Sequence, residues 1–245
     1  MERKKFLMQG IVGLGSIVAL SKTMMSCTES ADDVVTDSGT TDDTYTNDSS
    51  SSDSCELSPS ETAGPYPIKT PADLVRENLV SDRTGVALLI ILTIHDQSAD
   101  CAPLAGVLVD IWHCDKDGYY SEYNGSGYIS TKIDYTDRHF LRGRQTTDSN
   151  GQVSFISIYP GWYSGRAPHI HVEILDSSEK TIRVTQIAFP KSICDIVYAS
   201  SGYNGSADTL NSNDNVFSDS EDGNLADSIT GNTTDGYTLL KTIVV

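Results

Sequence analysis

The sequence predicts an all-β protein, an antiparallel β-sandwich with long loops and little helix. Short runs rich in Val, Ile and aromatic residues recur along the chain, and Gly, Asp, Asn or Pro bounds each of them. No long stretch shows helical periodicity, and strands at this spacing without helices between them favour a sandwich or a barrel. The expected strands are residues 86–94, 107–114, 152–158, 169–175, 181–188 and 237–245.

Little else in the chain is expected to have regular structure. Residues 72–78 offer one short helix, and the Asn-, Asp- and Ser-rich stretch 200–234 predicts a long surface loop. The β-sandwich domain is therefore expected to span residues 55–245.

The N-terminus has the pattern of a secretory signal. Basic residues at positions 3–5 precede an apolar run over residues 6–20, which is too short and too rich in glycine for a clear membrane span. The small residue directly before Cys27 resembles that of a bacterial lipobox. We expect residues 1–26 to be a signal peptide of the lipoprotein type and Cys27 to be the lipidated residue. A plainly cleaved signal and an uncleaved anchor are the alternatives.

Residues 27–54 predict a disordered tether. They are mostly Ser, Thr and Asp, contain no Lys or Arg, and have too few apolar side chains to offset the entropy of ordering. The expected location is extracytoplasmic, as a bacterial cell-envelope lipoprotein in the periplasm or on the cell surface. Contact with the membrane is expected only through the lipid anchor at Cys27.

The charge of the chain argues against nucleic acid as a partner. Lys and Arg number 17 against 34 Asp and Glu, which gives a formal net charge of −17. Such a surface repels a phosphate backbone.

Four cysteines follow Cys27, and in an exported protein they predict disulfides. They are Cys55, Cys101, Cys114 and Cys194. Their spacing lacks the clustering of a zinc site. Two bridges, in any of three connectivities, and one bridge with two free thiols both stay open, because Cys114 falls in an expected buried strand.

A pair of histidines is the first candidate for a metal site. On an extended strand alternate residues share a face, so His169 and His171 point the same way with Cα atoms about 7 Å apart. They can therefore bind one ion. A structural pair, or a zinc or copper site, would use the same spacing.

Tyrosines near this pair change the preferred ion. Tyr159 and Tyr163 precede the histidines, and Tyr119 and Tyr120 follow an Asp-Gly turn at the end of another strand. Phenolate and imidazole together form a hard, anionic ligand set, which suits Fe(III) better than Zn(II) or Cu(I). Which tyrosine of each pair reaches the metal stays open from this reasoning.

Four motifs in order resemble those of the intradiol ring-cleavage dioxygenases, the relatives of protocatechuate 3,4-dioxygenase and catechol 1,2-dioxygenase. The resemblance runs from about Cys55 to the end of the chain, and the family fold is a β-sandwich. The motifs are Glu61-Thr-Ala-Gly-Pro-Tyr66, Asp110-Ile-Trp-His-Cys114 with Gly118-Tyr-Tyr-Ser121, Phe140-Leu-Arg-Gly-Arg-Gln-Thr-Thr-Asp148, and Gly165-Arg-Ala-Pro-His-Ile-His171.

The resemblance implies a role for each matching residue. The metal ligands would be Tyr120, Tyr163, His169 and His171. Arg166 would stabilise negative charge on the substrate and on oxygen, and Gln186 would line the pocket and position the substrate. Gly64 and Pro65 would border the substrate. Only five residues separate Tyr163 from His169, fewer than in most of the family, so a differently shaped pocket is expected.

The function implied by the resemblance is cleavage of a catechol or polyphenol by O₂ at one Fe(III) per chain, giving a muconate-type diacid. Arg166, Gln186 and Tyr163 would carry the reaction. The alternative from another class is a cell-surface binding module that keeps the fold and captures aromatic or glycan ligands without turnover.

Overall fold

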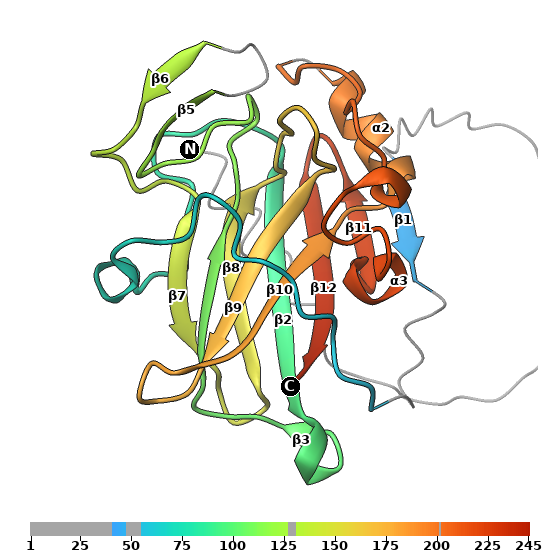
Figure 1. Cartoon of the computed structure of the whole chain (residues 1–245). Coiled ribbons are helices and arrows are strands. Elements are labelled where there is room, and N and C mark those ends of the chain that lie inside the picture. The colour runs from blue at the N-terminus through green and yellow to red at the C-terminus, as the bar shows by residue number, and fades with distance from the viewer. Residues whose placement is uncertain (1–40, 48–54, 127–130, 201) are drawn as a thin grey trace, which may run out of the picture. The chain divides into compact units, whose positions relative to one another are not determined.

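The computed structural model describes residues 41–47, 55–126, 131–200 and 202–245 (Figure 1). The predicted signal peptide, residues 1–26, and the predicted lipidation at Cys27 lie outside these ranges. The unit Asp42–Val245 is mostly β, as predicted, and is built mainly from two sheets. No helix in the described part is long and apolar enough to cross a bilayer.

The larger sheet is centred on β2 (Ala87–Asp96). This strand pairs antiparallel with β8 (Gln152–Ile158) and parallel with β12 (Gly236–Val244). The parallel pair departs from the antiparallel arrangement that was predicted, and the long connection between the two strands makes it possible. The other strands of this sheet are β11 (Ser228–Asn232), β1 (Asp43–Thr46) and β3 (Ala102–Pro103).

The smaller sheet has four antiparallel strands in the order β10-β9-β4-β7. Three of them fall on predicted strands, whereas the polar sequence of β7 gave no such signal. Their bounds are β10 (Thr181–Ala188), β9 (His169–Leu175), β4 (Leu108–Trp112) and β7 (Arg142–Thr146). A separate hairpin consists of β5 (Asn124–Ser126) and β6 (Lys132–Asp134).

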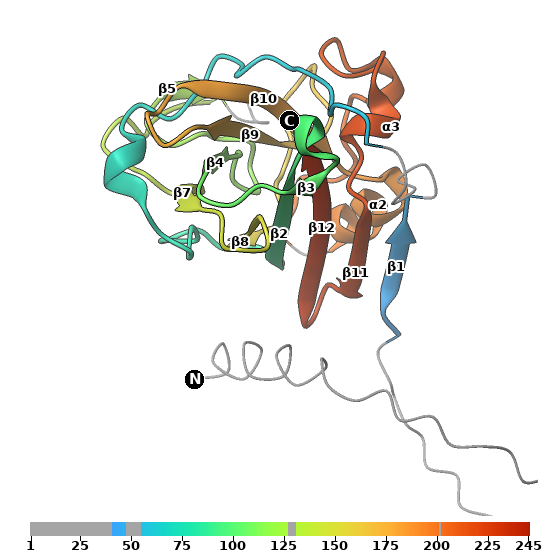
Figure 2. The ribbon, with the colours of Figure 1, turned by 90° about the horizontal axis from the view of Figure 1, so that it is seen from below.

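Alternate residues of both sheets meet in one apolar core. Leu88 and Ile90 of β2 and Ile170 and Val172 of β9 are fully buried members of the same cluster. Burial of these side chains holds the two sheets together. Figure 2 shows the strands of the two sheets from below. The residues between them on the smaller sheet, including His171, therefore face the other way, and we call that side the outer face.

The outer face is covered by residues 61–76, which we call the covering segment (Figure 1). Glu61 donates its backbone N–H to the carbonyl of Val184 in β10 at 2.8 Å, and Arg76 donates to the carbonyl of Arg144 in β7 at 3.2 Å. The segment thus crosses the sheet from one edge to the other. Its one helical turn is η1 (Pro71–Leu74), shorter than the helix expected over residues 72–78.

An α-helix that was not predicted follows β10. In α2 (Lys191–Ala199), buried residues recur with the spacing of a helix face. The run is only nine residues long, and its apolar character also fits a strand. The buried side chains are Ile193, Cys194, Val197 and Tyr198.

The prediction of a surface loop over residues 200–234 is wrong in part. The stretch contains η3 (Asn211–Asn213), α3 (Glu221–Asn224) and β11, and it buries Asp214 and Phe217 completely. Its polar composition concealed these elements because Asp214 is satisfied by an internal partner, Arg166, rather than by water.

The prediction of a disordered tether is wrong for β1. Asp43–Thr46 pairs antiparallel with β11 along its whole length. An edge strand is held by backbone hydrogen bonds and can keep one side in solvent, so it does not need an apolar sequence.

The cysteines form one bridge with two free thiols. Cys55 is bonded to Cys101, while Cys114 and Cys194 are free and buried. This is one of the arrangements that the sequence left open.

Candidate metal centre

Four side chains from four neighbouring strands form a row across the outer face. In cross-strand register, Gln186 of β10 pairs with His171 of β9, His171 with Trp112 of β4, and Trp112 with Arg142 of β7. All four are buried, because the covering segment lies over them. The indole of Trp112 stacks parallel on the imidazole of His171 at 4.9 Å, which fixes the plane of that ring.

The two histidines bring their Nε2 atoms together. The Nε2 atoms of His169 and His171 are 3.1 Å apart. Nδ1 of His169 lies 2.6 Å from the carbonyl of Ala167, and because a carbonyl only accepts, Nδ1 carries the proton. The Nε2 lone pair of His169 is therefore available to a cation.

The tyrosines next to these histidines are Tyr120 and Tyr163. The hydroxyl of Tyr120 lies 3.5 Å from Nε2 of His169, and the ring of Tyr163 is 5.9 Å from the ring of His169 and 5.8 Å from that of Tyr120. The neighbouring tyrosines point elsewhere. The hydroxyl of Tyr119 donates to the carbonyl of Thr131, and that of Tyr159 lies 3.3 Å from Sγ of Cys194 in the core.

Burial holds these four groups in their neutral forms. It raises the pKa of Tyr163 to about 12, against the charge of Arg166, and raises the pKa of Tyr120 well above its usual value. Burial and then the charge of Arg166 lower the pKa of His169 to about 3. Neutral imidazoles are ready to bind a metal, whereas the phenols ionise only beside a strong Lewis acid.

The donor set fits Fe(III). Two phenol oxygens and two imidazole nitrogens are hard ligands that carry two negative charges once the tyrosines ionise. Within the described ranges, no group of three or more His, Cys, Asp or Glu side chains comes together as a metal site. The two tyrosines therefore supply the donors that complete this ligand set beside the two histidines.

Arg166 is held beside this centre by two side chains. Its Nε donates to both carboxylate oxygens of Asp214, at 2.8 and 3.1 Å, and its Nη2 donates to Oε1 of Gln186 at 2.6 Å. Gln186 in turn donates to the carbonyl of Thr62 in the covering segment at 2.8 Å. The structure therefore joins Arg166 and Gln186, which were both expected at the site.

Sequence analysis missed Asp214, which is fully buried. It also accepts the backbone N–H of Ala167, two residues before His169. Burial alone would raise the pKa of Asp214, but hydrogen bonds from Arg166, Ala167 and Val216 hold it below its usual value. Nothing in the sequence distinguishes this aspartate from the others in its polar stretch.

The covering segment packs on the ligands. Gly64 adopts φ +68°, and a Cβ at this position would lie 2.9 Å from Cε1 of His171. Pro65, the other residue expected to border the substrate, is exposed. Tyr66, whose role was not foreseen, stacks on Tyr120 with ring centroids 4.7 Å apart.

Arg142 ties the covering segment to the loop between β4 and β5, which carries Tyr120. It is fully buried and donates to Oγ of Ser121 at 2.9 Å, to the carbonyl of Ser121 at 2.6 Å and to the carbonyl of Tyr66 at 2.8 Å. Its guanidinium lies 5.8 Å from the centre of the Tyr120 ring. It therefore orients both tyrosine-bearing segments.

Known proteins with a similar sequence and a similar fold are dioxygenases. A family model described as "Dioxygenase" matches residues 63–224. An intradiol ring-cleavage dioxygenase from Tetranychus urticae is 32% identical, with a TM-score of 0.68 over 78% of this chain and 94% of that one. The chain belongs to the intradiol ring-cleavage dioxygenase family.

Two other relatives of this intradiol dioxygenase chain are more distant. The dioxygenase domain of a dioxygenase carbohydrate-binding protein fusion from Streptomyces sp. SirexAA-E is 27% identical, with a TM-score of 0.55 over 78% of this chain and 98% of that one. The chlorocatechol 1,2-dioxygenase of Rhodococcus opacus is 26% identical over 128 residues, which are 44% of this chain and 46% of the relative. The chain thus matches less than half of that relative's length.

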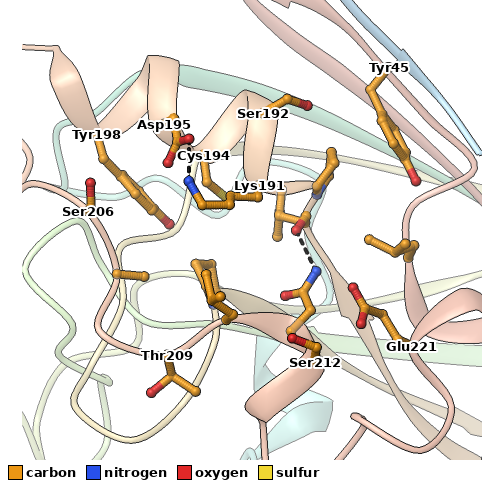
Figure 3. A pocket seen from close by; sticks show the side chains of 17 residues that line it. Tyr45, Lys191, Ser192, Cys194, Asp195, Tyr198, Ser206, Thr209, Ser212 and Glu221 are labelled. Atoms are coloured by element: carbon orange, nitrogen blue, oxygen red, sulfur yellow. Dashed lines mark hydrogen bonds and ion pairs between the residues drawn. The ribbon is translucent and has the colours of Figure 1, made fainter.

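A pocket of about 370 Å³ lies elsewhere, between α2 and residues 206–225 (Figure 3). None of the residues expected at the metal centre lines it, although Pro168, the neighbour of His169, does. Lys191 at its edge is paired with Asp195. The candidate metal centre therefore lies outside this pocket.

Proposed function

We propose that this family member cleaves a catechol-type ring with O₂, between the two hydroxyl-bearing carbons, at one Fe(III) held by Tyr120, Tyr163, His169 and His171. The observation that carries the proposal is the convergence of these four side chains, with Nε2 of His169 3.1 Å from Nε2 of His171 and 3.5 Å from the hydroxyl of Tyr120. Bound iron would supply a Lewis acid that favours the ionised catechol and makes its ring reactive toward O₂.

The reaction balances without an outside reductant. Both atoms of one O₂ enter the product, the bond between the two oxygenated carbons breaks, and each of these carbons becomes a carboxyl group. The product is a muconate-type diacid.

The chain's own residues bind and orient the substrate. Tyr163 is the more exposed of the two tyrosines, and once ionised as a metal ligand it would be placed to accept a proton from a catechol hydroxyl. Arg166 places a positive charge beside the substrate, held in position by Asp214 and Gln186. Trp112 and the covering segment keep the site dry, which strengthens these electrostatic interactions.

Metal content and absorption test the ligand set. Purified protein is expected to bind one iron per chain, to show a visible tyrosinate-to-iron band, and to consume O₂ with catechol. The double variant Tyr120→Phe with Tyr163→Phe should lose the band. The matched control is Tyr119→Phe with Tyr159→Phe, which removes the neighbouring hydroxyls and should keep it. Zinc in place of iron, or an unchanged band in the first double variant, would refute the assignment.

We also propose an extracytoplasmic location, with a lipid anchor at Cys27. The Cys55–Cys101 bridge supports it, because disulfides persist in oxidising compartments. Labelled palmitate should be incorporated by the full chain and not by Cys27→Ala. Equal labelling of both proteins would contradict the anchor.

A further inference from the structure

The positive charge of Arg166 is already balanced inside the protein. Its Nε donates to both oxygens of Asp214, a carboxylate with no solvent exposure. Because the two charges form a close pair, the carboxylate offsets much of the attraction that the guanidinium would exert on an anion farther away, such as a charged substituent of the ring. Nη2 is also occupied, by Gln186 at 2.6 Å.

The second arginine near the ligands is committed as well. All three nitrogens of Arg142 donate to Tyr66 and Ser121, and its Nε lies 3.6 Å from the carboxylate of Glu122. Lys69 lies in the middle of the covering segment. Its ammonium donates to the carbonyl of Glu122 and lies over the ring of Tyr123. Among the described residues that adjoin the site, these cations all have partners in the protein.

The apolar residues at the site form one partly exposed cluster, and two acidic residues lie near it. Ala63, Tyr66, Ile68 and Tyr163 pack as one cluster with Trp112 and Tyr120. The acidic neighbours are Glu61, at the start of the covering segment, and Asp208, which accepts hydrogen bonds from Ser164 and Gly165. A negatively charged substituent on the ring would therefore lie against aromatic side chains and near other negative charges.

We propose, resting on the function proposed above, that this site takes catechols with uncharged, apolar or aromatic substituents and discriminates against carboxylated catechols. A carboxylate on the ring would give up its hydrating water in the site without forming an ion pair with a cation. An apolar substituent would bury its surface against the aromatic cluster. The formal net charge of −17 acts in the same direction at longer range.

A matched pair of substrates tests the charge preference. 3,4-Dihydroxybenzamide and 3,4-dihydroxybenzoate have almost the same shape and differ in charge. The iron-loaded full chain is expected to favour the amide by at least about tenfold in kcat/KM, and to bind it more tightly in an anaerobic titration of the visible band. Equal values, or a preference for the benzoate, would overturn the inference.

A designed cation at the edge of the site makes the test sharper. Ile68→Lys should raise the benzoate-to-benzamide ratio several-fold, while Ile68→Gln, of similar length and no charge, should leave the ratio as it is. The role of charge would be contradicted if the benzoate-to-benzamide ratio stayed the same in Ile68→Lys, or if it changed equally in Ile68→Lys and Ile68→Gln. If neither compound nor catechol itself is cleaved, the proposed function fails, and the anaerobic binding ratio still decides the charge preference.

Discussion

At the residue scale, tyrosines that are close in the sequence point to different parts of the structure. Tyr159 enters the core while Tyr163 reaches the histidines, and Tyr119 bonds to Thr131 while Tyr120 reaches them. Reasoning from composition and spacing could not separate the members of each pair. The family resemblance assigned Tyr120 and Tyr163, and the structure places these two beside the histidines.

Gly64 is required for two separable reasons, a positive φ and contact with His171. Gly64→Ala should therefore lower the free energy of unfolding by about 1 kcal/mol through backbone strain and also weaken iron binding about tenfold by displacing the imidazole. Gly106→Ala is the matched control, since Gly106 has φ +80° and a Cβ added to it would meet no heavy atom within 4 Å. Urea unfolding and iron titration of both variants measure the two effects. Equal iron affinity in both would show that the contact does not matter.

Asp214→Asn should destabilise the protein and slow the reaction together. It leaves the buried guanidinium of Arg166 without its ion-pair partner, which costs about 3–5 kcal/mol of unfolding free energy. Because Arg166 also loses its orientation, kcat/KM should fall about a hundredfold. Asp137→Asn, at an exposed aspartate outside the site, is the control and should change neither. Unchanged oxygen uptake in Asp214→Asn would contradict the role given to this residue.

The same aspartate predicts a pH dependence of stability. The pKa of Asp214 is lower in the folded chain than its usual value, so the carboxylate stabilises the fold fully above about pH 4. As the pH falls below that, through the lowered folded pKa, the contribution is lost. The difference in unfolding free energy between the wild type and Asp214→Asn should therefore shrink under acid conditions. If the difference in unfolding free energy instead grew toward low pH, the pKa of Asp214 would have to be raised by folding, which would contradict the prediction.

At the element scale, strand alternation explains most of the site. Once β9 was predicted, the shared face of His169 and His171 followed, and their 3.1 Å approach confirms it. The cross-strand row could not be predicted, because the register of β4, β7 and β10 depends on pairings that one sequence does not reveal. β7 itself was missed because Arg142 and Arg144 are polar yet buried, each satisfied by a partner such as Asp110 for Arg144.

Arg142→Lys tests the row at its β7 end. A lysine lacks the planar set of donors that reaches both Ser121 and Tyr66, so the unfolding free energy should fall by about 3 kcal/mol. The visible tyrosinate band should also shift, because Tyr120 is no longer held by its neighbours. Arg138→Lys, at an exposed arginine, should do neither. An unshifted band in Arg142→Lys would limit its role to stability.

At the scale of the whole molecule, the sandwich was predictable and its coverings were not. The apolar runs identified the strands of both layers, since burial on one or both faces leaves a clear pattern. The covering segment and residues 206–225 show no regular hydrophobic pattern, and hydrogen bonds and an ion pair hold them in addition to local apolar contacts. Such interactions leave little trace in a single sequence.

The disulfide attaches the chain that leads into the covering segment to the larger sheet. Cys55 lies shortly before the covering segment, and Cys101 lies shortly after β2. The two cysteines have a sequence separation of 46, so removing the bridge as Cys55→Ser with Cys101→Ser should cost about 4 kcal/mol of unfolding free energy. Cleavage within residues 55–70 by a protease should also become faster. Cys114→Ala, at a free thiol, is the control for loss of a cysteine, and equal protease resistance in all three proteins would contradict the fastening role.

The place of β12 has a consequence for biosynthesis. Although it follows every other strand in the chain, it lies between β11 and β2 and supplies the parallel neighbour of the central strand. A nascent chain that ends before Gly236 therefore leaves both β2 and β11 with open hydrogen-bonding edges. The larger sheet can therefore be completed only after residues 236–244 have left the ribosome.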